Sequence, residues 1–171
     1  KNAIKIFLFT LLILLFSMPS YQGSGDTVPN ELLPITIINE RNLDFNEFLE
    51  NSKYNFIEMV RYGSNIPYFF SRVNERVVSL YPIIPGILNL PVFVAAQMLG
   101  LELSNNRLSL SHITSVTIAI LSVVFIYLSL INLCTRKNAA IFITLVYALG
   151  TGVWSVSSKA IWQHGPSIMF L

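Results

Sequence analysis

The sequence is poor in charge, and this sets its class. Only 12% of its 171 residues are Asp, Glu, Lys or Arg, whereas 53% are hydrophobic. A soluble domain usually carries about twice this share of charged residues. The composition therefore excludes an ordinary soluble domain and indicates a protein of the lipid bilayer.

Cysteine and histidine are also scarce, with one Cys and two His in the chain. A single cysteine, Cys134, excludes an intrachain disulfide and gives no information about the redox compartment. These three residues do not have the spacing of metal ligands, so the sequence predicts no metal site and no cofactor, and it leaves open whether a metal takes part. The basic residues form no surface typical of nucleic-acid binding, and we expect no nucleic-acid partner.

The charge that is present gathers in residues 21–78. This segment holds eight of the nine acids and five of the eleven bases, and its net charge is −3. It lies between an apolar N-terminal stretch and an apolar remainder. We therefore expect it to form an exterior loop.

The first transmembrane helix is predicted within residues 1–20. Asn2 to Met18 is almost entirely apolar, and about 17 residues is near the lower limit for crossing a bilayer. Lys1 and Lys5 should remain in the cytoplasm. A cleaved signal peptide is the alternative; because no clear cleavage site follows, we favour a retained anchor.

Two more transmembrane helices are predicted, at residues 112–135 and 139–158. Ile113 to Leu133 is free of charge, and bases follow in the turn 136–138, which should therefore be cytoplasmic. The third helix returns to the exterior face, where residues 159–171 form a turn and begin another apolar segment. Since the chain starts without Met and stops inside that segment, we expect a fragment of a longer multi-pass protein.

Within the loop, a short amphipathic helix is predicted at Asn30 to Asn39, and a short helix followed by loop at Asn46 to Asn65. The clearest strand pattern comes next. Tyr68 to Val73 and Arg76 to Tyr81 are two β-rich runs separated by the turn pair Asn74-Glu75, which predicts a β-hairpin.

Residues 79–111 are expected to form broken interfacial or re-entrant helices. Val77 to Leu101 has no charge, but Pro82, Pro85 and Pro91 interrupt it, and the proline-free remainder is only about 10 residues, or roughly 15 Å of helix. The predicted fold class is thus an all-α polytopic membrane protein with three transmembrane helices. Its exterior loop carries short interfacial helices and a β-hairpin.

Asp26 is the candidate catalytic residue. It follows Gly23-Ser24-Gly25, whose glycines let the chain turn just beyond the first helix, so its carboxylate should lie close to the bilayer surface. A general base placed there would meet a lipid-linked substrate. The alternative is that Asp26 caps the helix opened by Thr27-Val28-Pro29, because Asp is a preferred N-cap residue.

The order of these parts resembles the GT-C membrane glycosyltransferases, which include protein O-mannosyltransferases and lipid A aminoarabinose transferases. The similar segments are the first helix with Gly25-Asp26 outside it, Tyr81-Pro82-Ile83-Ile84-Pro85-Gly86, Thr151-Gly152-Val153-Trp154-Ser155 and Trp162-Gln163-His164-Gly165-Pro166. The resemblance implies a bacterial, multi-pass cell-membrane enzyme. Such an enzyme moves a sugar from a polyprenyl-phosphate carrier to a glycan, lipid or protein acceptor at the non-cytoplasmic face, which would hold residues 21–111.

In this resemblance Asp26 takes the place of the family's acidic residue after the first helix. Many members carry Asp-Glu there, but Thr27 follows in this chain, so a second carboxylate must come from elsewhere. Glu31 and Glu40 are the nearest candidates, and we rank Glu40 first because it falls at a predicted turn.

Stabilising the leaving phosphate needs cationic or donor side chains. The candidates are Arg72, Arg76, Lys159 and His164. Each also has a simpler explanation: solvated strand charges for the arginines, snorkelling for Lys159 and a tight turn for His164. A non-enzymatic transporter or assembly subunit is the alternative function, since broken helices also occur in transporters.

Overall fold

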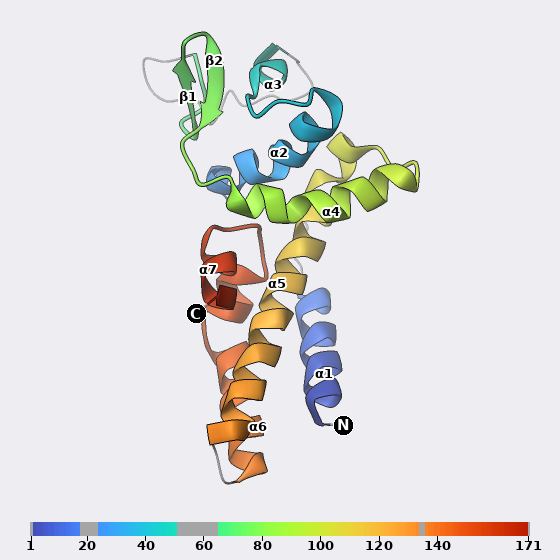
Figure 1. Cartoon of the computed structure of the whole chain (residues 1–171), viewed down its shortest axis with the longest axis vertical. Helices are drawn as coiled ribbons and strands as arrows, with labels where there is room; N and C mark the ends of the chain where they lie inside the picture. The colour runs from blue at the N-terminus through green and yellow to red at the C-terminus, as the bar shows by residue number, and fades with distance from the viewer. Residues whose placement is uncertain (1, 18–23, 51–64, 134–135, 171) are drawn as a thin grey trace. The chain divides into compact units, whose positions relative to one another are not determined.

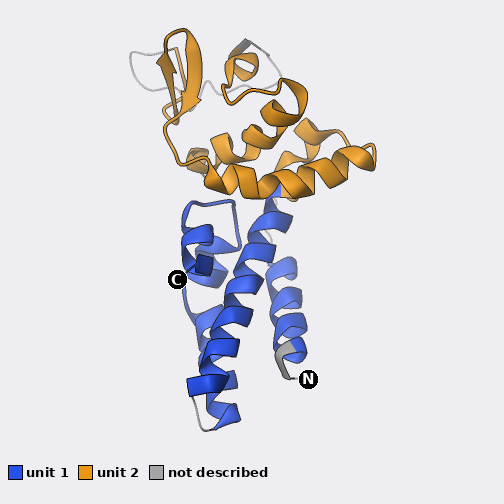
Figure 2. Cartoon of the chain, viewed as in Figure 1, with its two compact units in different colours: residues 1–22, 111–171 blue, residues 23–110 orange. Residues whose placement is uncertain are grey.

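The structure is a computed structural model that describes residues 2–17, 24–50, 65–133 and 136–170. It is mostly helical with one strand pair, as predicted (Figure 1). Contacts divide the chain into two units, residues 1–22 with 111–171 and residues 23–110 (Figure 2). In chain order the elements are α1 (Asn2–Phe16), a 3-10 turn (Gly25–Thr27), α2 (Val28–Asn39), α3 (Asn46–Glu50), β1 (Phe70–Val73), β2 (Arg76–Ser79), α4 (Ile84–Met98), α5 (Leu103–Leu133), α6 (Lys137–Gly150), a π-helical turn (Val153–Ser157) and α7 (His164–Phe170).

In the unit formed by residues 23–110, α2 and α4 pack closely on each other. Gly86 lies at their contact, because a Cβ added there would come within 2.7 Å of Leu33 Cδ2. The amide of Gly86 belongs to the first turn of α4, where no partner exists within the helix, and it donates to Asn30 Oδ1 at 3.2 Å. The side chain of Asn89 donates to the Asn30 carbonyl at 3.3 Å. Asn30 thus satisfies two polar groups buried at the helix contact.

The predicted β-hairpin is confirmed, with β1 and β2 paired antiparallel. Asn74 and Glu75 form its turn with φ angles of 48° and 66°, as a two-residue type I′ turn requires. The open edge of β2 is covered, because Phe45 N–H donates to Val77 O at 2.8 Å and Val77 N–H donates to Asn46 Oδ1 at 2.7 Å. The hairpin is therefore fixed to the start of α3.

In the other unit, α1, α5, α6 and α7 share a second apolar core. Small residues are buried where these helices meet, including Ala119, Ala140 and Ala148. The segment after α6 holds the C-terminal end of α1: Trp154 Nε1 donates to Ser17 Oγ at 3.1 Å, and Lys159 Nζ donates to Ser17 O. A lysine at the last carbonyls of a helix is a favourable C-terminal partner.

Among the described helices, α5 alone is long and apolar enough to cross a membrane, judged by length and composition. It has 31 residues, or about 46 Å of helix. The apolar helices α1, α4 and α6 have 15, 15 and 14 residues, or about 21 to 22 Å. These are shorter than the roughly 30 Å of a hydrocarbon core, so length does not confirm three spanning helices.

The prediction of broken helices in residues 79–111 is wrong, since Ile84–Met98 is one continuous helix. Pro85 lies in the first turn, where its missing N–H costs nothing, and only Pro91 removes an internal hydrogen bond. Burial of Phe93 and Ala96 in the core shared with α2 offsets that loss. The last residues of the predicted segment belong to α5, which begins at Leu103, because hydropathy reports the apolar part of a helix and not its start.

Two further predictions differ from the structure. The third predicted span, residues 139–158, is not one helix: α6 ends at Gly150, Thr151 is extended, and a short π-helical turn follows. The glycines on either side of Thr151 favour this interruption. In addition, α2 is not amphipathic, because every residue from Val28 to Thr36 is buried.

Candidate functional site

Asp26 lies in the 3-10 turn that leads into α2. Ser24 caps this turn, and its Oγ accepts the backbone N–H of Asp26 at 3.2 Å. The residue before α2 is Thr27, which makes no side-chain cap bond. The alternative that Asp26 caps the helix is therefore wrong, and its carboxylate points elsewhere.

Two tyrosines, one just before β1 and one just after β2, hold this carboxylate. The hydroxyls of Tyr68 and Tyr81 each donate to Asp26 Oδ1 at 2.8 Å. Asp26 Oδ2 accepts no hydrogen bond from a described residue, and the side chain is partly exposed. Within the part of the chain that the structure describes, the carboxylate is thus fixed by one oxygen and receives no donor at the other.

Gly25 allows this arrangement. A Cβ at this position would come within 2.6 Å of Tyr68 Oη and 3.0 Å of Phe69 Cδ1. Distances under 3.0 Å do not occur for real Cβ atoms, so any side chain would displace the Tyr68 ring. The glycine before Asp26 thus serves close approach by a tyrosine, in addition to the turn that the sequence predicted.

Both tyrosines stay protonated over the physiological range. Burial, with a further contribution from the Asp26 carboxylate, raises the pKa of Tyr81 to about 12. The same causes raise the pKa of Tyr68. The hydroxyls therefore remain donors, and Asp26 keeps both partners.

We expect Asp26→Asn to lower the pKa of Tyr81 toward its ordinary value, because it removes the negative charge that disfavours the phenolate. The measurement is the alkaline titration of tyrosine absorbance, with Tyr81→Phe subtracted to isolate this residue among the seven tyrosines. Because the pKa of Tyr81 is about 10 in the unfolded chain and about 12 in the folded protein, its contribution to the stability of the fold is full below about pH 10. That contribution is lost as the pH rises through about 12. An unchanged Tyr81 titration in the Asp26→Asn variant would contradict the hydrogen bond.

A second set of polar contacts involves Thr27, the residue that follows Asp26. Thr27 Oγ1 is within hydrogen-bond distance of Ser24 O, at 3.1 Å, and of Glu31 Oε1, at 2.7 Å. Glu31 is only 2% exposed, and its other oxygen forms an ion pair with Arg107 at the start of α5. Burial raises the pKa of Glu31, and the charge of Arg107 and the Thr27 hydroxyl offset part of that rise.

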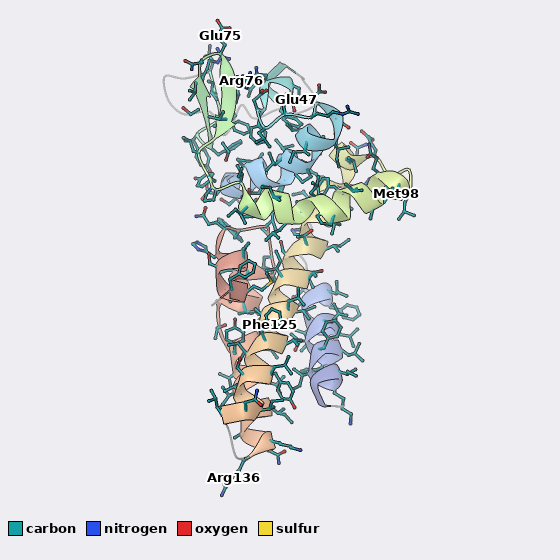
Figure 3. All side chains as sticks on the ribbon, in the orientation of Figure 1. Glu47, Glu75, Arg76, Met98, Phe125 and Arg136 are labelled. Carbon is teal, nitrogen blue, oxygen red and sulfur yellow. The ribbon has the colours of Figure 1, made fainter. Side chains whose placement is uncertain are left out.

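Glu40, the favoured second carboxylate, does not lie beside Asp26. It is the C-cap residue of α2, whereas Asp26 precedes the first turn, and the 12 residues of α2 span about 18 Å. Its neighbours are the acids of the next segment: burial raises the pKa of Glu47, labelled in Figure 3, and the charges of Asp44 and Glu40 add to the rise. Glu31, ranked lower from the sequence, is the carboxylate close to the Asp26 turn.

The four predicted phosphate-binding residues fall in both units, two in each. Arg72 on β1 and Arg76 on β2 are both exposed, and Figure 3 labels Arg76 on the hairpin. Arg76 pairs across the strands with Val73, the neighbour of Arg72, so the two arginines face opposite sides of the hairpin. Lys159, in the other unit, binds Ser17 and lies 5.8 Å over the Trp154 ring, and burial lowers its pKa. His164 is exposed at the start of α7.

Sequence reasoning missed three residues of this site. Tyr68 and Tyr81 were assigned to the strands, and only the motif that begins at Tyr81 marked that residue. Arg107 had a usable signal, because it is the one base between Arg76 and Arg136. A charge at the edge of a long apolar region needs a partner, and Glu31 is a partner of Arg107.

The described residues contain no group of three or more His, Cys, Asp or Glu that could hold a metal ion. The site is therefore one carboxylate with two tyrosyl donors, supported by a buried ion pair. Comparison of the chain with the models of known protein families, with curated proteins and with solved structures finds no match.

Proposed function

We propose that this chain is part of an integral-membrane glycosyltransferase in which Asp26 is the general base. The observation that carries this proposal is the geometry of its carboxylate. Two tyrosyl hydroxyls fix Oδ1, and Oδ2 is left without a donor from the described residues. A base must reach the proton it removes while keeping its own orientation, and this arrangement supports both.

The proposed reaction needs few groups. The hydroxyl or amine of the acceptor gives its proton to Asp26 as its oxygen or nitrogen bonds to the anomeric carbon of the sugar. The bond from that carbon to phosphate breaks, and its electron pair leaves with the polyprenyl phosphate. Tyr68 and Tyr81 hold the carboxylate in place, and a cationic or hydrogen-bond-donating side chain stabilises the departing phosphate. The proposed candidates for that role remain Arg72, Arg76, Lys159 and His164.

A bilayer location is supported by the apolar residues that the helices leave exposed. In the most apolar stretch of α5 only 39% of residues are buried within the protein, unlike the core helix of a soluble domain. Phe16 on α1 and Phe142 on α6 are 89% and 69% exposed. Exposed surface of this kind marks contact with lipid or with another protein. We propose that α1, α5 and α6 are the three membrane helices.

The helix α4 supports an interfacial position for the loop. It carries no charge, and the side facing away from α2 exposes apolar residues. These are Ile84, Ile87, Val94 and Met98, continued by Leu99 and Leu101 after the helix ends. A helix of about 22 Å with one face packed on protein and an uncharged apolar opposite face suits the membrane surface.

The proposed topology predicts opposite sides for two exposed asparagines. Cysteine at Asn105 should react with a membrane-impermeant thiol reagent from the exterior, and cysteine at Asn138 should react only after the membrane is opened. Both positions are exposed, and Asn138 follows the two bases that should remain in the cytoplasm. The native Cys134 is first replaced by Ser. Labelling of both positions from one side would contradict a single crossing by α5.

The direct test of function is transfer of a labelled sugar from synthetic polyprenyl phosphates by the purified full-length protein in liposomes. Transfer that depends on Asp26 supports the proposal. Failure of a panel of polyprenyl-phosphate sugars, together with substrate movement across the liposome membrane, would support the transporter alternative.

A further inference from the structure

Glu31 and Arg107 are a buried ion pair without a part in the chemistry proposed so far. Glu31 lies in the first turn of α2 and Arg107 in the second turn of α5, and both belong to the unit formed by residues 23–110. Taking two charges out of water costs several kcal/mol for each ion, and apolar residues of similar size would often hold the same helices as well. Such a pair therefore calls for an explanation beyond stability.

The contacts of Thr27 supply one. Its hydroxyl lies between Glu31 Oε1 and the carbonyl of Ser24, so the same side chain touches the ion pair and the start of the turn. Asp26 directly precedes Thr27 and lies in the 3-10 turn that begins after Ser24 and ends at Thr27. The hydroxyls of Tyr68 and Tyr81 hold the Asp26 side chain, and the Thr27 hydroxyl contacts the Ser24 carbonyl at the start of the same turn.

We propose that Glu31 and Arg107 are positioning residues that act through Thr27 to hold the backbone of the Asp26 turn. This inference rests on the proposed function, since it assigns the pair to the same site. Without Arg107, the Glu31 carboxylate is no longer held in place at the first turn of α2. The Thr27 hydroxyl then loses its fixed partner, and the turn gains freedom that moves Asp26 relative to the acceptor.

Three variants of the full-length protein break the chain of contacts at different points: Arg107→Gln, Glu31→Gln and Thr27→Val. We expect Arg107→Gln and Thr27→Val to lower kcat for sugar transfer by about 10- to 100-fold, because displacing a reacting group by about 1 Å has effects of that size. The KM for the lipid donor should change less than about two-fold, since no donor contact is removed. Glu31→Gln keeps a hydrogen-bond acceptor for the Thr27 hydroxyl and should lower kcat less than the other two variants.

The matched control is Asn30→Ala. Asn30 is the neighbour of Glu31 on α2 and is almost as buried, but its side-chain oxygen accepts from the Gly86 amide of α4, and among the described residues no side-chain hydrogen bond joins it to the Asp26 turn. It should lower the melting temperature while leaving kcat near that of the natural protein. A role in stability alone would make Arg107→Gln and Thr27→Val behave like Asn30→Ala, and that result would overturn the proposal.

A second readout does not depend on activity. Amide hydrogen exchange, followed by mass spectrometry, should become at least about 10-fold faster at residues 25–28 in Arg107→Gln and Thr27→Val, and should stay unchanged there in Asn30→Ala. If no sugar is transferred by the natural protein, the proposed function fails, and the exchange comparison still decides whether the pair holds the turn. If Arg107→Gln does not fold, Thr27→Val decides, because it leaves the buried ion pair intact.

Discussion

Replacing Asp26 by asparagine is expected to lower the rate of sugar transfer by about 10²- to 10⁴-fold, the usual contribution of a general base. The amide oxygen of Asn can still accept hydrogen bonds from Tyr68 and Tyr81, so the hairpin and the turn should keep their places. An amide does not take up a proton at neutral pH, and the acceptor would then attack without a base. The assay is transfer from a polyprenyl-phosphate sugar by full-length protein in liposomes.

The control makes the same chemical change where it should not matter. Glu75→Gln replaces an exposed acid at the hairpin tip with its amide, and transfer should be unchanged (Figure 3). Glu40→Gln tests the carboxylate that the sequence favoured, and its place at the far end of α2 predicts a small effect. Near-normal transfer by Asp26→Asn would remove Asp26 from the chemistry and direct attention to Glu31.

Gly86→Val is expected to destabilise the protein by about 1–3 kcal/mol, the cost of overfilling a packed core. Even a Cβ would lie 2.7 Å from Leu33 Cδ2 and 3.3 Å from the Asn30 backbone, and the backbone has no simple way to yield. Separation of α2 from α4 would also weaken the bond from the Gly86 amide to Asn30. The measurement is the unfolding temperature in detergent or in nanodiscs.

Two other glycines separate crowding from backbone conformation. Gly152→Ala should be nearly neutral, because there is open space around it and its φ of −62° suits any residue. Gly100 also has open space around it, but its φ of +74° is costly for alanine. We therefore expect Gly100→Ala to lower the stability of the protein, though by less than Gly86→Val. Equal losses at Gly86 and Gly152 would contradict a close helix contact at Gly86.

The hairpin could be predicted from the sequence because its signal is local. The pair Asn74-Glu75 between β-rich runs contains the information for a two-residue turn. Proline was a less reliable guide. Pro85 and Pro91 predicted a break, but a proline in a first turn costs nothing, and the packing of α4 on α2 sustained the helix through Pro91.

The arrangement around Asp26 could not be predicted because it depends on distant parts of the chain. Tyr68 and Tyr81 lie 42 and 55 residues from Asp26, and Arg107 lies 76 residues from Glu31. Burial of α2 on nearly all sides had the same cause, since it depends on α4 and the aromatic residues of the loop. Choosing Glu40 over Glu31 followed a turn signal, whereas the structure favours the acid with a buried partner.

These separations also set an order of events during synthesis. A ribosome adds roughly 5–20 residues per second, so Tyr81 follows Asp26 by about 3 to 11 seconds and Arg107 follows Glu31 by about 4 to 15 seconds. During that interval the Glu31 carboxylate has no partner charge, whereas the apolar residues of α2 gain their partner helix, α4, before Arg107 is added. The ion pair between Glu31 and Arg107 is therefore the last of these contacts that becomes possible during synthesis.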